Sequence, residues 1–371
     1  MNIKQLKPNG ITVVDLFCGA GIGAIGLKLA GCNIVYAIDN LKEAVDTYNL
    51  NIGNHAECLP IQKKNLNDIP NADLIIGGSP CKDFSIAGKG DGIQGKYGSL
   101  LFYFIETIRI KKPKSFIFEN VDGFVSNKNI SDFNIFINNL ESLGYCISYQ
   151  VVNMHDYGVP QKRKRIIVVG LLSNVVFSFP DIVPESNRLT LRDAIGDLPE
   201  PNHKFNHYGY GLRNDEAPFV DKVPFGGNWK DLPIEDQKTF MKQSYYSSGG
   251  KTTYLRKVLF NKPAYTIMSS MNGKYAAQII DQADKYQNAD FNWWEQKILY
   301  PVPDNYNLEK ALQEKRLPPR RYTVRECLRI QSVPDSFVFK DEVSLNKQYE
   351  RCSGIPSLFA YKLINHLIFF L

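Results

Sequence analysis

The sequence has little that would place it in a membrane, a disulfide framework or a zinc site. No apolar run approaches the ~20 residues that cross a bilayer, and the first ten residues are polar, unlike the core of a signal peptide. The seven cysteines are an odd number and no two have Cys-x-x-Cys spacing, which argues against disulfide pairing and structural zinc. We therefore expect a soluble, cytoplasmic protein that binds no metal and no membrane.

Charge of one sign is also scarce. The 44 basic and 38 acidic residues leave a net charge of only +6 on 371 residues, so a nucleic-acid partner is permitted but not demanded. Any basic contact surface must be local, and the candidates are 111–114, 162–165 and 320–321, although short basic runs are usually solvated surface. The hydrophobic content of 44% argues against disorder, and the length allows two or three domains of roughly 100–200 residues.

Short apolar runs alternate with segments of helical periodicity over the first 174 residues. The expected strands are 11–17, 34–38, 73–76, 115–118, 147–152 and 166–171. This alternation indicates a parallel, doubly wound sheet and therefore an α/β fold. From about residue 175 the alternation is lost, and helical patterns return near 324–330 and 358–370. We predict an α/β domain at 1–174, a smaller irregular domain at 175–339, and a segment, 340–371, that returns to the first domain.

A glycine turn follows the first apolar run. Gly19, Gly21, Gly23 and Gly26 separate that run from a helical segment. Glycines let the backbone pass close to a ligand, and a helix N-terminus offers unpaired N–H donors. Asp39 ends the next run, where a carboxylate can bind ribose hydroxyls. These features favour a nucleoside-containing cofactor and fit NAD(P) and S-adenosylmethionine equally well.

Three further segments carry reactive side chains. Cys81 lies in a Gly-Pro turn after the third run, where ligands collect in an open α/β sheet, and this favours a nucleophile over a buried hydrophobe. Glu119 ends another apolar run and is suited to acid–base chemistry, the alternatives being a helix cap or an ion pair. Arg163 and Arg165 share one face if extended, where they bind a carbonyl or phosphate unless they form a solvated strand edge.

With these segments in this order, the chain resembles the DNA (cytosine-5)-methyltransferases. The matching segments are 15–23, 80–81, 119–121, 161–165 and 321–337, and a shorter likeness at 262–267 contains Thr266. The resemblance implies a doubly wound, Rossmann-like, S-adenosylmethionine-dependent sheet in a catalytic, cofactor-binding domain at 1–174. It also implies a target-recognition domain and hinge at 175–339.

The resemblance further implies a reaction and its residues. The reaction is sequence-specific transfer of a methyl group from S-adenosylmethionine to carbon 5 of a flipped-out cytosine in double-stranded DNA, through a covalent cysteine adduct, with S-adenosylhomocysteine as product. The implied catalytic residues are Cys81, Glu119, Arg163 and Arg165. The implied cofactor-binding residues are Phe17, Gly19, Gly21, Gly23, Asp39, Pro80 and Leu100. The implied DNA-binding residues are Ser85, Lys89, Gln161 and Thr266.

The resemblance also implies an oligomeric state, a cellular location and a biological role. It implies a monomer, cytoplasmic and nucleoid-associated in a prokaryote or encoded by a virus, that works in a restriction-modification system beside a cognate restriction endonuclease. The chain departs from the family pattern at three points. The segment 349–357 lacks the usual Gly-Asn, Lys82 replaces a common glutamine, and the register places Asn65, with Asp68 nearby, where an acidic adenine contact is usual.

Three alternatives have different signatures. An RNA (tRNA) cytosine-5 methyltransferase shares most of these motifs, although 79–81 and the long insertion favour DNA. A nicotinamide oxidoreductase explains Gly21–Gly26 and Asp39 but not the spacing of Cys81, Glu119 and the two arginines. A catalytically dead DNA-binding protein requires loss of the nucleophile, and Cys81 is present.

Overall fold

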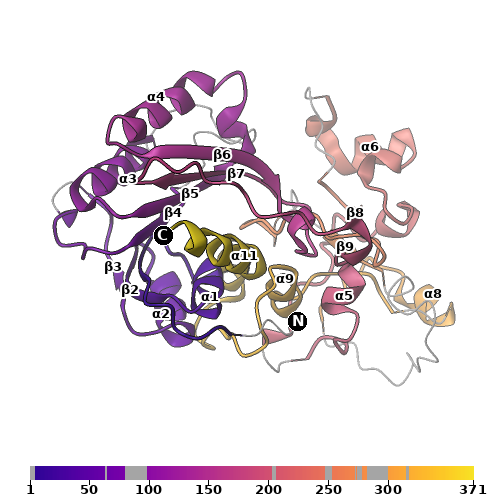
Figure 1. Ribbon diagram of the computed structural model, residues 1–371. Coiled ribbons are helices and arrows are strands. Elements are labelled where there is room, and N and C mark those ends of the chain that lie inside the picture. The colour runs from indigo at the N-terminus through magenta and orange to yellow at the C-terminus, as the bar shows by residue number, and fades with distance from the viewer. Residues whose placement is uncertain are drawn as a thin grey trace. The chain divides into compact units, whose positions relative to one another are not determined.

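The computed structural model describes residues 5–62, 65–79, 98–202, 206–246, 253–271, 273, 278–281, 300–314 and 317–371. The chain divides into two compact units (Figure 1). Unit 1 is Met1–Arg188 together with Gly354–Leu371, and unit 2 is Leu189–Ser353. The boundaries predicted after residues 174 and 339 each precede a boundary between the units.

Unit 1 contains, in its described part, a seven-stranded sheet of order β3-β2-β1-β4-β5-β7-β6 (Figure 1). The strands are β1 (Thr12–Leu16), β2 (Asn33–Asp39), β3 (Ala56–Cys58), β4 (Leu74–Gly77), β5 (Ser115–Val121), β6 (Cys146–Asn153) and β7 (Lys164–Leu171). β1 to β5 pair in parallel, which confirms the predicted α/β fold. β7 departs from the predicted parallel sheet because it is antiparallel to both β5 and β6. Only residues 154–163 join β6 to β7, too few for the crossover that a parallel pair needs.

Helices cover both faces of this sheet. They are α1 (Ile22–Leu29), α2 (Lys42–Asn51), α3 (Gly98–Lys111), α4 (Ile130–Glu141) and α11 (Ser357–Leu367), with 3₁₀ turns at Asp122–Val125, Met154–Tyr157, Glu185–Asn187 and Ile368–Phe370. α3 and α4 pack on one face through buried phenylalanines, with Phe104 and Phe136 at ring-centroid distances of 5.0 and 4.6 Å from Phe118 of β5. Each such ring contributes about 1.5–3 kcal/mol by leaving water.

The opposite face carries α1 packed against α11, helices from the two ends of the chain (Figure 1). The Ser357 hydroxyl donates a hydrogen bond to the Ile22 carbonyl at 2.7 Å. A Cβ atom at Gly26 would lie 2.4 Å from the Ser357 carbonyl oxygen and 2.6 Å from the Tyr361 amide nitrogen. The helices therefore approach this closely only because residue 26 has no side chain.

Unit 2 is less regular. Within its described residues a small sheet has the order β10-β9-β8, with β8 (Arg256–Lys257) parallel to β9 (Gln278–Ile280) and β10 (Arg320–Arg321) antiparallel to β9. The helices are α5 (Leu191–Ile195), α6 (Ile234–Met241), α8 (Leu308–Gln313), α9 (Val324–Ile330) and α10 (Leu345–Arg351), with 3₁₀ turns at Val220–Lys222, Trp229–Asp231 and Lys242–Tyr246. Trp229, Leu255 and Ile279 belong to its apolar core.

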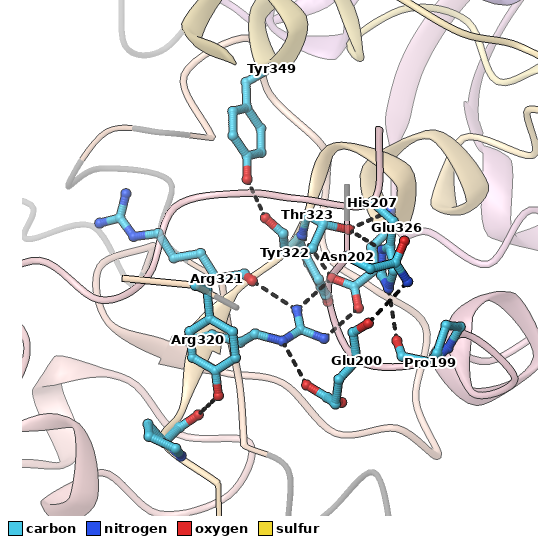
Figure 2. A network of polar contacts seen from close by, with 12 residues as sticks. Pro199, Glu200, Asn202, His207, Arg320, Arg321, Tyr322, Thr323, Glu326 and Tyr349 are labelled. Atoms are coloured by element: carbon cyan, nitrogen blue, oxygen red, sulfur yellow. Dashed lines mark hydrogen bonds and ion pairs between the residues drawn. The ribbon is translucent and has the colours of Figure 1, made fainter. Parts of the chain in front are cut away.

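A buried polar network anchors β10 in unit 2 (Figure 2). Arg320 donates two hydrogen bonds of 2.8 Å to the Glu326 carboxylate, and its Nε lies 3.4 Å from Glu200. Glu326 also accepts from the Thr323 amide at 2.8 Å, and the Thr323 hydroxyl accepts from the Glu326 amide, which closes a capping box at α9. The His207 ring spans this hydroxyl and the Pro199 carbonyl at 2.9 and 2.8 Å. This pairing satisfies charges that would otherwise be costly to bury.

The described residues contain neither a membrane-spanning helix nor a metal-binding cluster. No helix there is long and apolar enough to cross a membrane. No group of three or more His, Cys, Asp or Glu side chains in the same residues is arranged to hold a metal ion.

Candidate active site

The turn between β1 and α1 is built from left-handed backbone. Phe17, Gly19 and Gly21 have φ angles of 57°, 54° and 87°. For phenylalanine this conformation costs about 1–3 kcal/mol, and such strain clusters at ligand-binding sites. The Asp39 carboxylate at the end of β2 ties the turn down, because its oxygens accept from the Gly19 and Leu41 amides at 3.0 Å each. The structure thus brings the predicted cofactor residues of β1 and β2 together.

The glycines of this turn serve different needs. A Cβ atom at Gly21 would lie 2.8 Å from the Ile52 side chain, so packing and φ both require glycine there. A Cβ atom at Gly19 would meet no described atom within 4 Å, so open space lies beside the turn. At Gly23, the second residue of α1, the nearest atom would be in Ile355 at 3.6 Å. Ile355 belongs to the segment in which the family pattern has Gly-Asn, so an apolar side chain stands beside the loop instead of an amide.

Asp15, in β1, is a candidate that the sequence analysis gave no role of its own. It is buried, with 8% of its surface exposed. Burial, with the nearby Asp39 charge as a smaller cause, raises the pKa of Asp15 to about 8. The available signal was an acidic residue inside an otherwise apolar run. A buried carboxyl in the strand that leads into this turn is suited to a cationic ligand group.

The second cluster joins the ends of β5 and β7. Val121 pairs with Arg165 across the antiparallel ladder, so Glu119 and Arg165 are diagonal neighbours on one face. Arg165 Nε lies 3.0 Å and the Arg163 guanidinium 3.9 Å from Glu119 Oε1, and all three side chains are at most 15% exposed. Three of the four predicted catalytic residues therefore meet.

Glu119 Oε1 is buried but accepts no hydrogen bond within the described structure. Arg165 is close enough for an ion pair, but its N–H does not point at this oxygen, so the contact is electrostatic only. A buried acceptor left in this state costs about 1–3 kcal/mol, which a donor on a bound ligand can recover.

The chain leading to Cys81 runs beside this cluster. A Cβ atom at Gly78 would lie 3.0 Å from the Glu119 carbonyl oxygen and 3.1 Å from Glu119 Oε2. The Asn120 amide donates to the Ser79 carbonyl at 3.4 Å. Glycine at position 78 therefore allows the end of β4 to lie against Glu119. The predicted residues Pro80, Cys81, Ser85 and Lys89 are outside the described residues.

The remaining predicted residues are scattered. Leu100 lies in the first turn of α3 and is partly buried. Gln161 is completely buried, which favours support of the segment carrying Arg163 over a direct contact with DNA. Thr266 is half-buried in unit 2. The basic pair Arg320 and Arg321, considered as a nucleic-acid contact, is buried and paired with glutamates, so that interpretation was wrong.

A mostly parallel sheet with one antiparallel strand, a glycine turn after β1 and a charged cluster at β5 and β7 defines a Rossmann-like methyltransferase fold. Comparison with known proteins identifies the family. The model of the C-5 cytosine-specific DNA methylase family matches residues 11–367, and the chain belongs to this family. It is a DNA (cytosine-5-)-methyltransferase, which confirms the predicted family and enzyme class.

Individual relatives of the chain are consistent with this family assignment. The chain is 33% identical over 329 residues to the type II methyltransferase M.MthTI of Methanothermobacter thermautotrophicus, covering 88% of each chain. It is 29% identical over 350 residues to the type II methyltransferase M.NgoFVII of Neisseria gonorrhoeae, covering 91% of this chain and 81% of the relative. Among solved structures, Entamoeba histolytica methyltransferase EhMeth matches with a TM-score of 0.66 at 14% identity, covering 98% of each chain, and so supports the fold alone.

Proposed function

We propose that this methyltransferase moves a methyl group from S-adenosylmethionine to carbon 5 of a flipped-out cytosine within a specific sequence of duplex DNA, through a covalent adduct with Cys81. The observation that carries the proposal is the Glu119 cluster. A buried carboxylate oxygen there is held by two arginines, accepts no hydrogen bond from the described residues, and lies beside the chain leading to Cys81. This arrangement suits a ligand that presents N–H donors and develops charge as it reacts.

The turn after β1 fits the cofactor. A Cβ at Gly19 would meet no described atom within 4 Å, and the Asp15 and Asp39 carboxyl groups lie near one another at this turn. The cofactor carries ribose hydroxyls, an ammonium group and a sulfonium centre, all of which suit carboxylate partners. We assign Asp39 to the ribose hydroxyls and Asp15 to the ammonium group, with Phe17 and Leu100 supplying apolar contact. When bound, the cofactor supplies the methyl group as an electrophile.

The chain's own residues make the cytosine reactive. Carbon 5 is a weak nucleophile, so the Cys81 thiolate adds to carbon 6 and the displaced electron pair moves through the ring towards nitrogen 3. Glu119 in its carboxylic acid form donates its proton to nitrogen 3, so that negative charge does not build up in the ring, and its other oxygen accepts from the exocyclic amino group of the base. Arg165, with Arg163 beside it, binds the base carbonyl and holds Glu119 in place. After methylation a base removes the proton on carbon 5, and the Cys81 sulfur leaves carbon 6.

A stacked base cannot reach the nucleophile of an enzyme, so the cytosine must leave the helix. We assign unit 2, with Thr266, to reading the target, and Ser85 and Lys89 to contacts with DNA near Cys81. The two relatives described above are named type II methyltransferases, which supports a role in a restriction-modification system. We propose that the enzyme acts there as a cytoplasmic monomer beside a cognate endonuclease.

The test is transfer of label from S-adenosylmethionine to unmethylated duplex DNA, with tRNA in parallel. We expect transfer to DNA, loss of transfer in Cys81→Ser, and a loss of about 10²-fold or more in Glu119→Gln. The matched control is Glu141→Gln, a change at an exposed position of α4 that leaves the rate unchanged. Transfer to tRNA alone, or full activity of Cys81→Ser, would contradict the proposal.

A further inference from the structure

The side chain of Gln278 in β9 holds the backbone of Tyr265 and Thr266. Its side chain is 4% exposed. Oε1 accepts from the Tyr265 amide at 3.2 Å, while Nε2 donates to the Tyr265 and Thr266 carbonyls at 3.4 and 3.3 Å. Residues 265–268 have no regular secondary structure. One buried side chain therefore hydrogen-bonds three backbone groups of this segment.

Arg256 holds the same residue from the neighbouring strand. Arg256 of β8 and Gln278 of β9 are register partners, so their side chains leave adjacent strands side by side. The Arg256 guanidinium carbon lies 3.7 Å from the centroid of the Tyr265 ring, a stacking distance. The ring and the backbone of Tyr265 are thus each fixed by one member of the pair.

β9 is itself tied to the buried network of Figure 2. Ile280 and Ile279 pair with Arg320 and Arg321 of β10. Arg320 is held by Glu326, as described above. The constraint on Tyr265 therefore extends back to well-packed structure and does not end at a surface loop.

We propose that Gln278 is a positioning residue for DNA engagement, because it sets the backbone at Tyr265–Thr266 and with it the direction of the half-buried Thr266 side chain. Threonine is β-branched and stiff at χ1, so the direction of its side chain follows closely from its backbone. This inference rests on the proposed function, in which Thr266 contacts DNA. Gln278 touches neither the DNA nor the cofactor and acts through the segment that it holds.

The test compares Gln278→Met with Gln237→Met. The first change keeps an unbranched side chain of similar length and removes the acceptor and the donor. The second is the matched control, because Gln237 also donates to two backbone carbonyls in unit 2, those of Lys230 and Leu232, at 2.8 Å each. Melting temperature and the kcat and KM for duplex DNA and for S-adenosylmethionine are measured for both variants and the wild type.

We expect Gln278→Met to lower kcat/KM for DNA by about tenfold or more, through a raised KM for DNA, while the KM for the cofactor changes by less than about twofold. Gln237→Met should stay within about twofold of the wild type for both substrates. If Gln278→Met does not fold, Gln278→Glu serves in its place. It keeps the acceptor for the Tyr265 amide and loses the donor to the two carbonyls, so the same rise in KM for DNA is expected.

The outcomes separate the two proposals. A wild type that methylates DNA, with Gln278 variants within about twofold of it, overturns the positioning role alone. Equal losses for DNA and cofactor, in step with a lowered melting temperature, also overturn it, because they describe a structural role only. A wild type that transfers no methyl group to DNA overturns the proposed function and this inference with it.

Discussion

Gly26→Ala should destabilise the protein, although alanine is the better helix former. The added Cβ would lie 2.4 Å from the Ser357 carbonyl oxygen, 2.6 Å from the Tyr361 amide nitrogen and 2.7 Å from the Ala360 Cβ. Two of these atoms are backbone of α11, so no side-chain rotation relieves the overlap, and α1 and α11 must separate. Overpacking of this kind costs about 1–3 kcal/mol, against a gain of up to about 1 kcal/mol in helix propensity.

Because the overlap is with backbone atoms, the cost lies at the upper end of that range and the net loss is about 2 kcal/mol, which lowers the melting temperature by a few degrees in a protein of this size. Gly23→Ala is the matched control in the same helix. Its Cβ would come no closer than 3.6 Å to a neighbouring atom, so its melting temperature should equal or exceed that of the wild type. Thermal unfolding without cofactor measures both. A Gly26→Ala variant as stable as Gly23→Ala would refute the close approach of α1 and α11.

Three further predictions concern titration and buried charge. Burial raises the pKa of Asp15 from 3.8 to about 8, so the stability that this carboxyl contributes is present at low pH and is lost as pH rises from about 4 to about 8. In urea titrations without cofactor, the unfolding free energy of Asp15→Asn should therefore not fall with pH over this range as that of the wild type does. The hydrogen bond from Lys114 is the main reason why the pKa of Asp73 falls to about 2, so the stability that Asp73 contributes is present above about pH 4 and is lost as pH falls through about 2. Lys114→Met should therefore be less stable than the wild type above about pH 4, and the difference in unfolding free energy should shrink as pH falls towards 2. Glu216→Ala leaves Arg321 buried without its carboxylate and should cost about 3–5 kcal/mol in denaturant unfolding, much of it regained in the double variant with Arg321→Met.

The regular part of unit 1 could be predicted from the sequence because its signals are local. The apolar runs at 11–17, 34–38, 73–76 and 166–171 each contain most or all of a strand, β1, β2, β4 and β7 respectively. The antiparallel direction of β7 was missed, because direction depends on what the preceding connection can span and apolar content carries no sign of it.

The strands of unit 2 could not be predicted from the sequence for a different reason. β8, β9 and β10 have two or three residues each, too few to show a period, and their pairing joins Arg320 to Ile280 across a long stretch of chain. The basic pair 320–321 suggested surface or a nucleic-acid contact, because two of its three glutamate partners, Glu200 and Glu216, lie 120 and 105 residues away in the sequence.

The candidate site likewise contains residues that could be predicted from the sequence and residues that could not. Glycine spacing and the carboxylate after β2 identified the turn, and strand ends identified Glu119 and the two arginines. Asp15 was not singled out, because its burial depends on the packing around β1 and not on its neighbours in the sequence. The role of Gln278 could not be predicted from the sequence, because its hydrogen bonds to Tyr265 form only when the fold brings the two residues together.

The contact between α1 and α11 also bears on how the chain is made. α1 ends at residue 29 and its partner begins at Ser357, so a ribosome releases all of unit 2 before the helix that completes unit 1 exists. During most of translation the cofactor turn therefore belongs to a sheet whose α1 side lacks the packing of α11, while the inserted unit is free to fold first. A nascent chain stalled before α11 emerges would expose the apolar face of α1 to chaperones, and supplying the missing helix as a separate peptide is a direct way to ask when this enzyme becomes native.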